Sequence, residues 1–336
     1  MTAALPRYEE GMDKHSATME GLPPLQLRHL RDLELAAPPE PGGKAHVASA
    51  SGVVRRGDFV YVIGDDQLHL AVFRMSSPEP GETVRILSGD LPEEAESRKA
   101  AKPDLEALTL LPPFRGHAYG ALLGLGSGSA PERDRGFVWP LNADGSLRDE
   151  VHDLDLAPLF ERLRGDIEAL NVEGACVVGD RLWLMHRGNR GGTTNVVVEL
   201  SLDRVMESIL GDERIDPGEV AALRSYDLGR LDGVELTFSD ATPLGRDLLV
   251  FTASAEAQES GGGDGSIRGS VIGTIDAGGD VQRLRTIDRR YKVEGVHASI
   301  DTGVMDLLFV CDQDDPGTPS PLLSAAMPLE AAFEQE

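Results

Sequence analysis

The sequence has little cysteine, no long apolar run and no redox or zinc motif. Only Cys176 and Cys311 occur in 336 residues, too few for a fold built on disulfides. Both stand in apolar segments, so we expect small buried hydrophobes. No CxxC pair or HExxH motif is present, which argues against a common zinc site. No apolar run approaches the roughly 18 residues that a membrane-spanning helix needs.

Positive charge is also scarce, since 32 basic residues face 57 acidic ones for a net charge of −25. Nucleic acids and anionic membranes bind cationic surfaces, so neither is an expected partner. The N-terminal segment lacks a basic stretch followed by an apolar one, and therefore no signal peptide is predicted. We expect a cytoplasmic location, or secretion if a leader has been removed. The sequence predicts no oligomeric state.

What the sequence does contain is a long internal repeat. An apolar residue followed by glutamate opens a short apolar strand at Glu106, Glu173, Glu235 and Glu294, roughly every 60 residues. A degenerate copy has Ser51 in place of the glutamate. Each copy continues with further apolar strands, separated by turns rich in glycine, aspartate and proline. This pattern predicts a five-bladed β-propeller with four antiparallel strands per blade.

The last copy ends after its third strand, and the N-terminal segment from Leu25 to Leu35 resembles the missing fourth one. Pairing the two would close the ring without a free sheet edge. We therefore expect a single propeller over residues 25–336 and a disordered or loosely attached extension over residues 1–24. Helical spacing predicts one short helix between Leu156 and Leu170 and another from Asp203. Two stacked β-domains or a sandwich are the alternative, but they do not explain the recurring glutamate.

The repeated position has a chemical meaning, because the first strand of every blade lines the central channel of a propeller. Clustered carboxylates repel one another unless protons, salt bridges or a cation compensate them. No lysine or arginine recurs at a matching position. Oxygen ligands favour calcium over magnesium, because calcium tolerates six to eight oxygens in irregular geometry. We expect a metal site formed by Ser51, Glu106, Glu173, Glu235 and Glu294. The alternative is that these side chains cap backbone groups or hold water.

The repeated unit resembles β-propeller families of unknown function from bacteria and the propellers grouped as esterase-like activity of phytase. The order Ser, Glu, Glu, Glu, Glu is also similar to that of the five-bladed calcium-activated nucleotidase (apyrase) propellers, which hold one axial calcium through glutamates and serines. The resemblance implies that the five ring residues bind calcium, although Glu235 falls where that family has a second serine. No segment matches that family's nucleotide-binding segments.

Loops between second and third strands open on the same face as this ring. Their candidate substrate-binding residues are Asp65, Ser127, Arg133, Arg135, Asn189, Ser254 and Asp312, and their candidate catalytic residues are His186 and Arg187. Guanidinium groups beside a metal favour a phosphate or carboxylate ligand. The leading hypothesis is a calcium-dependent hydrolase of a small anionic ester, phosphoester or lactone, with His186 or a rim carboxylate moving the proton. The alternative is a non-enzymatic propeller that binds a ligand or protein, with calcium locking its channel.

Overall fold

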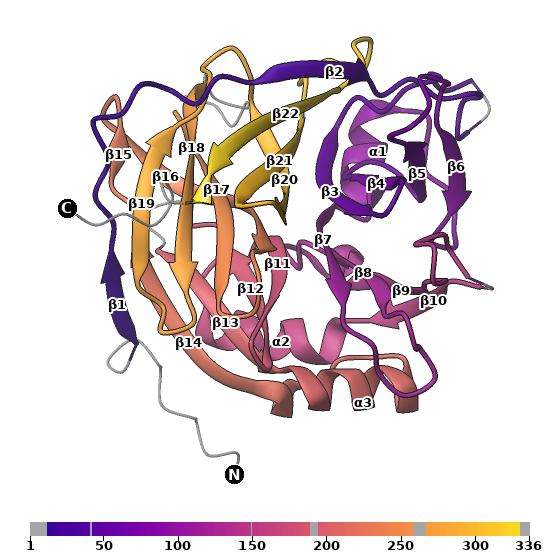
Figure 1. Cartoon of the computed structure of the whole chain (residues 1–336). Coiled ribbons are helices and arrows are strands. Elements are labelled where there is room, and N and C mark those ends of the chain that lie inside the picture. The colour runs from indigo at the N-terminus through magenta and orange to yellow at the C-terminus, as the bar shows by residue number, and fades with distance from the viewer. Residues whose placement is uncertain (1–11, 41, 149, 189–193, 258–266, 330–336) are drawn as a thin grey trace.

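The computed structural model describes residues 12–40, 42–148, 150–188, 194–257 and 267–329. These residues form five antiparallel sheets arranged around one axis (Figure 1). The five-bladed propeller predicted from the repeat is thereby confirmed, with four strands in each blade. Among the described residues, no helix has both the length and the apolar character needed to cross a membrane.

The blades follow one another along the chain, and each begins with the strand nearest the axis. Blade one contains β3 (Ala50–Arg56), β4 (Phe59–Gly64), β5 (His69–Arg74) and β6 (Glu82–Arg85). Blade two contains β7 (Leu105–Leu111), β8 (Ala121–Gly126), β9 (Arg135–Pro140) and β10 (His152–Asp155). Blade three contains β11 (Val172–Val178), β12 (Arg181–His186), β13 (Asn195–Ser201) and β14 (Val220–Asp227). Blade four contains β16 (Val234–Pro243), β17 (Leu248–Glu256), β18 (Ile267–Asp276) and β19 (Val281–Thr286), with β15 (Arg230–Leu231) added before β16.

Blade five is completed from the N-terminal side of the chain. Its strands β20 (Val293–Asp301), β21 (Val304–Cys311) and β22 (Pro321–Pro328) are joined by β2 (Arg28–Asp32), which pairs antiparallel with β22. Figure 1 shows the indigo β2 beside the yellow β22. The predicted closure of the ring by an N-terminal strand is therefore confirmed, and it leaves β22 without a free edge.

The segment before β2 runs along the outside of the propeller. Its strand β1 (Asp13–Ser16) pairs in parallel with β14, and Met19 and Leu25 form bridges to Leu284 and Ile287. These contacts differ from the loose attachment expected for residues 1–24, of which residues 1–11 lie outside the described part of the chain. One segment thus lies along the outer strands of blades three and four before it supplies β2, the outer strand of blade five.

Five apolar clusters fill the five interfaces between neighbouring blades. Strand β12 shows why the strands are apolar throughout. Its Leu182 and Leu184 enter the cluster shared with blade two, whereas Trp183 and Met185 enter the cluster shared with blade four. Alternate side chains of a strand point to opposite faces, so a strand with both faces covered has no polar side. Cys176 and Cys311 are free and buried in these clusters, as predicted.

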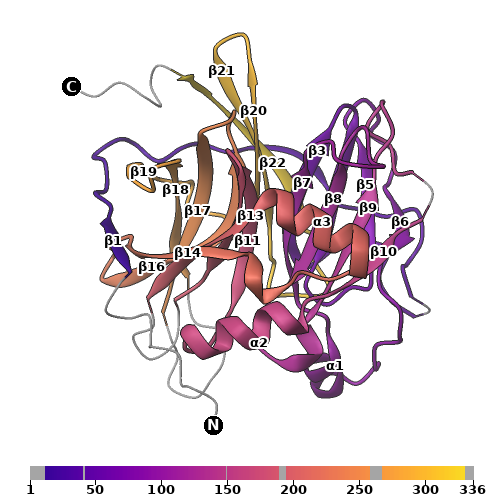
Figure 2. The same ribbon diagram turned by 90° about the horizontal axis from the view of Figure 1, so that it is seen from below.

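Three α-helices lie between strands of the described chain. Helix α2 (Ala157–Asp166) confirms the first predicted helix, and α3 (Leu202–Asp212) the second; both bury apolar side chains against the core between blades two and three. Helix α1 (Ala95–Ala101) was not predicted. Figure 2 shows α1 and α2 at one end of the propeller, the end at which the first strands begin. We call this end the channel mouth.

Candidate cation site at the channel mouth

Each first strand carries a β-bulge near its start. The register shifts lie between Ala50 and Gly52, Leu105 and Ala107, Val172 and Gly174, Phe238 and Asp240, and Val293 and Gly295. The residues skipped at these shifts are Ser51, Glu106, Glu173, Ser239 and Glu294, and we call them the channel ring. Because a bulge turns a side chain away from the regular pleat, the same backbone device places all five.

The channel ring corrects one predicted position, since Ser239 stands where Glu235 was expected. Glu235 lies on the β15–β16 hairpin, where it accepts a hydrogen bond from Arg230 at 2.6 Å, and its side chain is 58% exposed. The reason is that β16 begins earlier relative to its bulge than the other first strands do. The apolar-Glu pattern therefore matched the start of the strand and not the bulge. The apyrase propellers that the sequence resembles have a serine in fourth place, and this is the signal that could have led to Ser239.

The glycines that follow ring residues explain the rest of the repeated motif. A Cβ on Gly174 would lie 2.8 Å from the Cα of Asp240, and one on Gly295 would lie 3.0 Å from the Cα of Gly52. At Gly174 and at Gly295 the first strands of neighbouring blades therefore approach too closely for a side chain. The glutamate-glycine pair serves two purposes, because one residue faces the channel and the next lets the blades meet.

In blade four this glycine position holds Asp240, which is fully buried. Its carboxylate accepts hydrogen bonds from the backbone N–H of Val296 at 2.8 Å and of Ala241 at 2.7 Å. Burial raises the pKa of Asp240 well above its ordinary value, although these two donors oppose the shift. Asp240 thus links blade four to blade five by hydrogen bonds to the backbone.

The three glutamates of the channel ring affect one another electrostatically. Burial, followed by the charge of Glu173, raises the pKa of Glu106 well above its ordinary value. Burial also raises the pKa of Glu294 to about 7, with Glu173 adding to the shift. Burial raises the pKa of Glu173 as well, while Arg187 opposes that effect. Glu173 thus lies close enough to Glu106 and to Glu294 to influence the pKa of both.

Each ring glutamate has a cation from its own blade nearby. Arg187 Nη1 lies 3.4 Å from Glu173 Oε2, Lys292 Nζ lies 3.6 Å from Glu294 Oε1, and the charge of Lys102 lowers the pKa of Glu106. Sequence reasoning missed these cations because they come from unlike places: the end of α1, the loop after β12 and the loop before β20. Only the three-dimensional structure brings each of them close to its glutamate.

A second ring lies beside the first. On each second strand, one residue pairs with the residue just before the bulge, and the residue after it belongs to the second ring. The members are Asp65, Ser127, Arg187, Ser254 and Asp312. All five were among the predicted site residues, so the structure brings these candidates to equivalent positions. The backbone repeats as well, since the N–H of Asp65, Ser127 and Arg187 each donates to the carbonyl two residues before the ring residue.

The second ring and its neighbours share the cations with the channel ring. Lys102 contacts Asp65 and lies 2.7 Å from Asp104, while Lys292 lies 3.1 Å from Asp312 and 2.7 Å from Asp314. Carboxylate oxygens of Asp65, Asp104 and Glu106 lie within 4.8 Å of one another. Burial raises the pKa of Asp65 to about 6, against the lowering effect of Lys102.

Ser127 and Arg133 both donate hydrogen bonds to Asp104. Ser127 Oγ donates to Asp104 Oδ2 at 2.5 Å, and Arg133 Nη1 donates to the same oxygen at 2.8 Å and to Ser129 Oγ at 2.7 Å. Asp104 itself adopts a positive φ of 53° just before β7. This network holds the start of blade two and leaves Arg133 at the edge of the mouth.

In blade four the second ring forms a row of hydroxyl groups. Ser254 Oγ lies 3.1 Å from Ser239 Oγ and 2.9 Å from Ser270 Oγ, so the row crosses β16, β17 and β18. All three serines are buried. In blade one, Ser51 Oγ instead donates to the carbonyl of Leu105 at 2.6 Å. The two serines of the channel ring therefore have neutral partners.

Two further candidates, His186 and Arg135, lie away from the opening. His186 is fully buried; its Nδ1 lies 3.0 Å from the amide nitrogen of Asn171, and burial lowers its pKa to about 4. Arg135 donates to the carbonyl of Ser88 at 3.0 Å, on the flank towards blade one. Asn189 falls outside the described residues.

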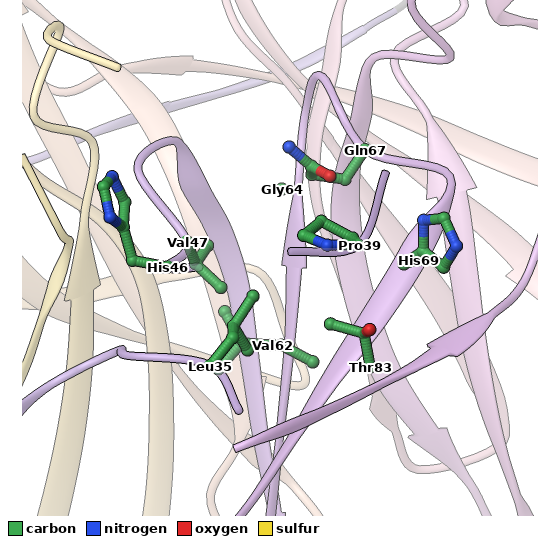
Figure 3. Close-up of a pocket in the computed structure, with 10 residues that line it drawn as sticks. Leu35, Pro39, His46, Val47, Val62, Gly64, Gln67, His69 and Thr83 are labelled. Atoms are coloured by element: carbon green, nitrogen blue, oxygen red, sulfur yellow. The ribbon is translucent and has the colours of Figure 1, made fainter. Parts of the chain in front are cut away.

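One small pocket lies at blade one (Figure 3). Its lining includes Leu35, Pro39, His46, Val62 and His69, and no ring residue belongs to it. Burial lowers the pKa of His69. We assign this pocket no role in the channel site.

Comparisons with known proteins add a family. A model described as a family of unknown function (DUF6929) matches residues 46–327. A search of curated proteins finds no match.

Solved structures resemble the chain only distantly. An α-L-arabinofuranosidase from Podospora anserina has 10% identity and a TM-score of 0.48, over 90% of this chain and 97% of that one. The glutaminyl cyclase of Myxococcus xanthus has 10% identity and a TM-score of 0.43, over 91% and 100%. A luciferin-regenerating enzyme has 10% identity and a TM-score of 0.40, over 84% and 92%. At these values none of the likenesses bears on activity, and the resemblance to the phytase-like and apyrase propellers stays a prediction. The match over residues 46–327 decides the family: the chain belongs to DUF6929, a family of unknown function.

Proposed function

We propose that this propeller binds a divalent cation, calcium foremost, at the channel ring and uses it to hydrolyse a small anionic ester, phosphoester or lactone. The observation that carries the proposal is the ring itself, with three carboxylates and two hydroxyls on five equivalent bulges. Its ligand atoms are all oxygens, which suits a hard cation. Among the described residues, no group donates a hydrogen bond to Glu106, so its oxygens are available as ligands.

Calcium is favoured over magnesium by the variety of the donors. Carboxylates and hydroxyls from five strands make an irregular oxygen set, and calcium accepts such a set more readily than magnesium does. The residues that would hold the ion are Ser51, Glu106, Glu173, Ser239 and Glu294. A bound cation supplies a Lewis acid that polarises an ester and stabilises negative charge on its oxygens.

The chain's own side chains supply the remaining functions. Arg133, at the edge of the mouth and 21% exposed, would orient the anionic group of the substrate. We assign proton transfer to Asp65 and not to His186, because His186 is enclosed in the protein. The Oδ1 atom of Asp65 has no hydrogen-bond partner among the described residues. Arg135 has no part in this proposal, since it turns towards Ser88.

A second function is favoured by the burial of the ring. Ser51, Glu173, Ser239 and Glu294 are all at most 8% exposed, so an ion held by them would be largely enclosed. Such an ion would lock the channel of a propeller that binds a ligand or protein without catalysis. Glu106 is the more accessible member, and a substrate would reach the ion from its side.

A melting experiment and a substrate screen test the proposal in order. A ligand that binds only the folded state at 100 times its dissociation constant stabilises by about 2.7 kcal/mol, so calcium is expected to raise the melting temperature and a chelator to lower it. Phosphoesters, carboxyl esters and lactones are then screened with and without calcium. Calcium-dependent turnover supports the hydrolase, stabilisation without turnover supports the locking ion, and the absence of both contradicts the cation site.

A further inference from the structure

Arg187 is a buried cation held between two carboxylates from different blades. Its Nη1 lies 3.4 Å from Oε2 of Glu173 in the channel ring, and its Nη2 lies 2.5 Å from Oε2 of Glu256 at the end of β17. The arginine side chain is 9% exposed and its Nε has no partner among the described residues. The guanidinium therefore joins blade three to blade four at the mouth.

The same guanidinium acts on the whole ring. Burial alone would lower the pKa of Arg187, but the charges of Glu173, Glu294, Glu256 and Glu106 together raise it. A divalent cation among the ring glutamates would need the oxygens that Arg187 now neutralises, and it would repel the guanidinium at short range. Arg187 and a metal ion thus compete for Glu173.

Glu256 offers the arginine another partner. Its side chain is 24% exposed, whereas that of Glu173 is 8% exposed. If Arg187 leaves Glu173, it keeps one carboxylate and is not left as an unpaired buried charge, which would be costly. The arrangement therefore allows the ring to change its counter-ion without breaking every contact of the arginine.

We propose that Arg187 is the internal counter-ion of the channel ring when no metal is bound and that Glu256 retains it when a divalent cation binds Glu173. This inference rests on the proposed cation site and adds a regulating residue to it. Lys102 and Lys292 repeat the arrangement, since each lies by a ring glutamate and also contacts carboxylates outside the ring. Among the described residues, no lysine or arginine contacts Ser51 or Ser239, which carry no charge to neutralise.

The test exploits the opposite effects expected for the two partners of one ion pair. Calcium binding is measured by isothermal titration on the full chain, for the parent, Arg187→Met and Glu256→Gln. Arg187→Met removes the competitor and is expected to tighten binding by about tenfold or more, which equals about 1.4 kcal/mol. Glu256→Gln removes the second carboxylate, so that Arg187 pairs with Glu173 alone. This variant is expected to weaken calcium binding by about tenfold.

Two further variants separate contact from general charge. Arg133→Met also removes an arginine at the mouth, but one that contacts Asp104 and Ser129. It is expected to change affinity by less than about threefold, because screened charges beyond direct contact act weakly. Arg187→Lys keeps the positive charge but lacks the guanidinium that contacts both carboxylates. This variant is expected to bind calcium more tightly than the parent but less tightly than Arg187→Met. It replaces Arg187→Met if that variant fails to fold in chelator.

Each result decides the matter. Opposite shifts for Arg187→Met and Glu256→Gln, larger than that for Arg133→Met, support the exchange. Affinity shifts in the same direction for Arg187→Met and Glu256→Gln overturn the exchange while leaving the cation site intact. Equal affinity shifts for Arg187→Met and Arg133→Met do the same. Binding by Arg187→Met in the absence of binding by the parent also supports it, because the arginine then outcompetes the ion. Binding by neither overturns the exchange and the cation site together.

Discussion

Blades three and four use the same two backbone positions for different chemistry. Blade three has Glu173 at its bulge and Arg187 on the next strand, whereas blade four has Ser239 and Ser254 at the matching positions. The first pair is ionic and the second is a contact between hydroxyls at 3.1 Å. The bulge therefore fixes where the side chain points, and the residue type decides whether that position carries charge.

The difference shows how charge is distributed around the ring. Three blades contribute a carboxylate together with a nearby cation, and two contribute a hydroxyl with neutral partners. A buried ion pair contributes little net stability because both charges lose water. In the proposed cation site, the charged positions would bind the ion and the neutral ones would complete its ligand set. The four predictions that follow test this difference, beginning with the largest effect.

The largest effect is expected for the core that the two blades share. Trp183 is 1% exposed in the cluster between blades three and four. Trp183→Ala is expected to lower the free energy of unfolding by about 3–5 kcal/mol, because a large cavity replaces the indole side chain. Urea unfolding measures this loss, with the exposed Leu210→Ala as control. A loss below about 1 kcal/mol would show that the blades do not share one packed core.

The next effect belongs to blade three alone, since His186 corresponds to Ala253 in blade four. Burial lowers the pKa of His186 to about 4 from an ordinary 6.5. The unfolded chain therefore binds this proton first as pH falls, and stability present above pH 6.5 is lost down to about pH 4. The loss corresponds to about 3 kcal/mol.

Urea unfolding of the parent and of His186→Gln between pH 7 and pH 4 isolates this contribution. The difference in stability between the two proteins is expected to shrink steadily as pH falls through that window. A difference that stays constant with pH would mean that His186 is not held neutral by its surroundings.

The calcium response is expected to distinguish the two ring positions. Saturation at 100 times the dissociation constant adds about 2.7 kcal/mol to the parent. Glu173→Gln is expected to lose most of this gain because it removes a charged ligand, whereas Ser239→Ala is expected to retain more than half. Melting curves in calcium and in chelator measure both. Equal losses would remove the distinction between charged and neutral positions.

The smallest effect is expected for the hydroxyl row. Ser254→Ala removes the central member and leaves Ser239 and Ser270 without their shared partner, at an expected cost of about 1 kcal/mol in unfolding free energy. Thermal unfolding in chelator measures this cost without any contribution from bound calcium. A neutral or stabilising result would indicate that the row is not part of what holds blade four.

Much of the architecture followed from one recurring residue type. The glutamates marked the first strands, and the missing final strand identified Leu25–Leu35 as the closing segment, with β2 at its centre. The fourth ring residue was misplaced because a sequence motif matches residue types, whereas the channel position is set by the bulge between Phe238 and Asp240. Strand register depends on how a strand pairs with its neighbour. The residue pattern of one strand carries no information about that pairing.

The sequence repeat could not predict the cations that compensate the ring glutamates. Lys102, Arg187 and Lys292 stand at different offsets from their glutamates, so no alignment of the copies superimposes them. The candidate rim residues were easier to predict, because four of them directly follow an apolar second strand and Ser254 lies near the end of β17. Asp65, Ser127, Arg187, Ser254 and Asp312 fall at equivalent places in the pairing of first and second strands. His186 was misjudged because it is the last residue of its strand and still points into the protein.

The pairing of β2 with β22 has a consequence for the order of folding. Residues 28–32 pair with residues 321–324 across the whole length of the domain, so this contact closes the longest loop in the propeller and carries a large entropic cost. Contacts within blades one to four are far more local and form without it. Because distant contacts slow folding, we expect ring closure to be the late, slow step. Until then, β22 exposes an unpaired edge through which incomplete molecules can associate.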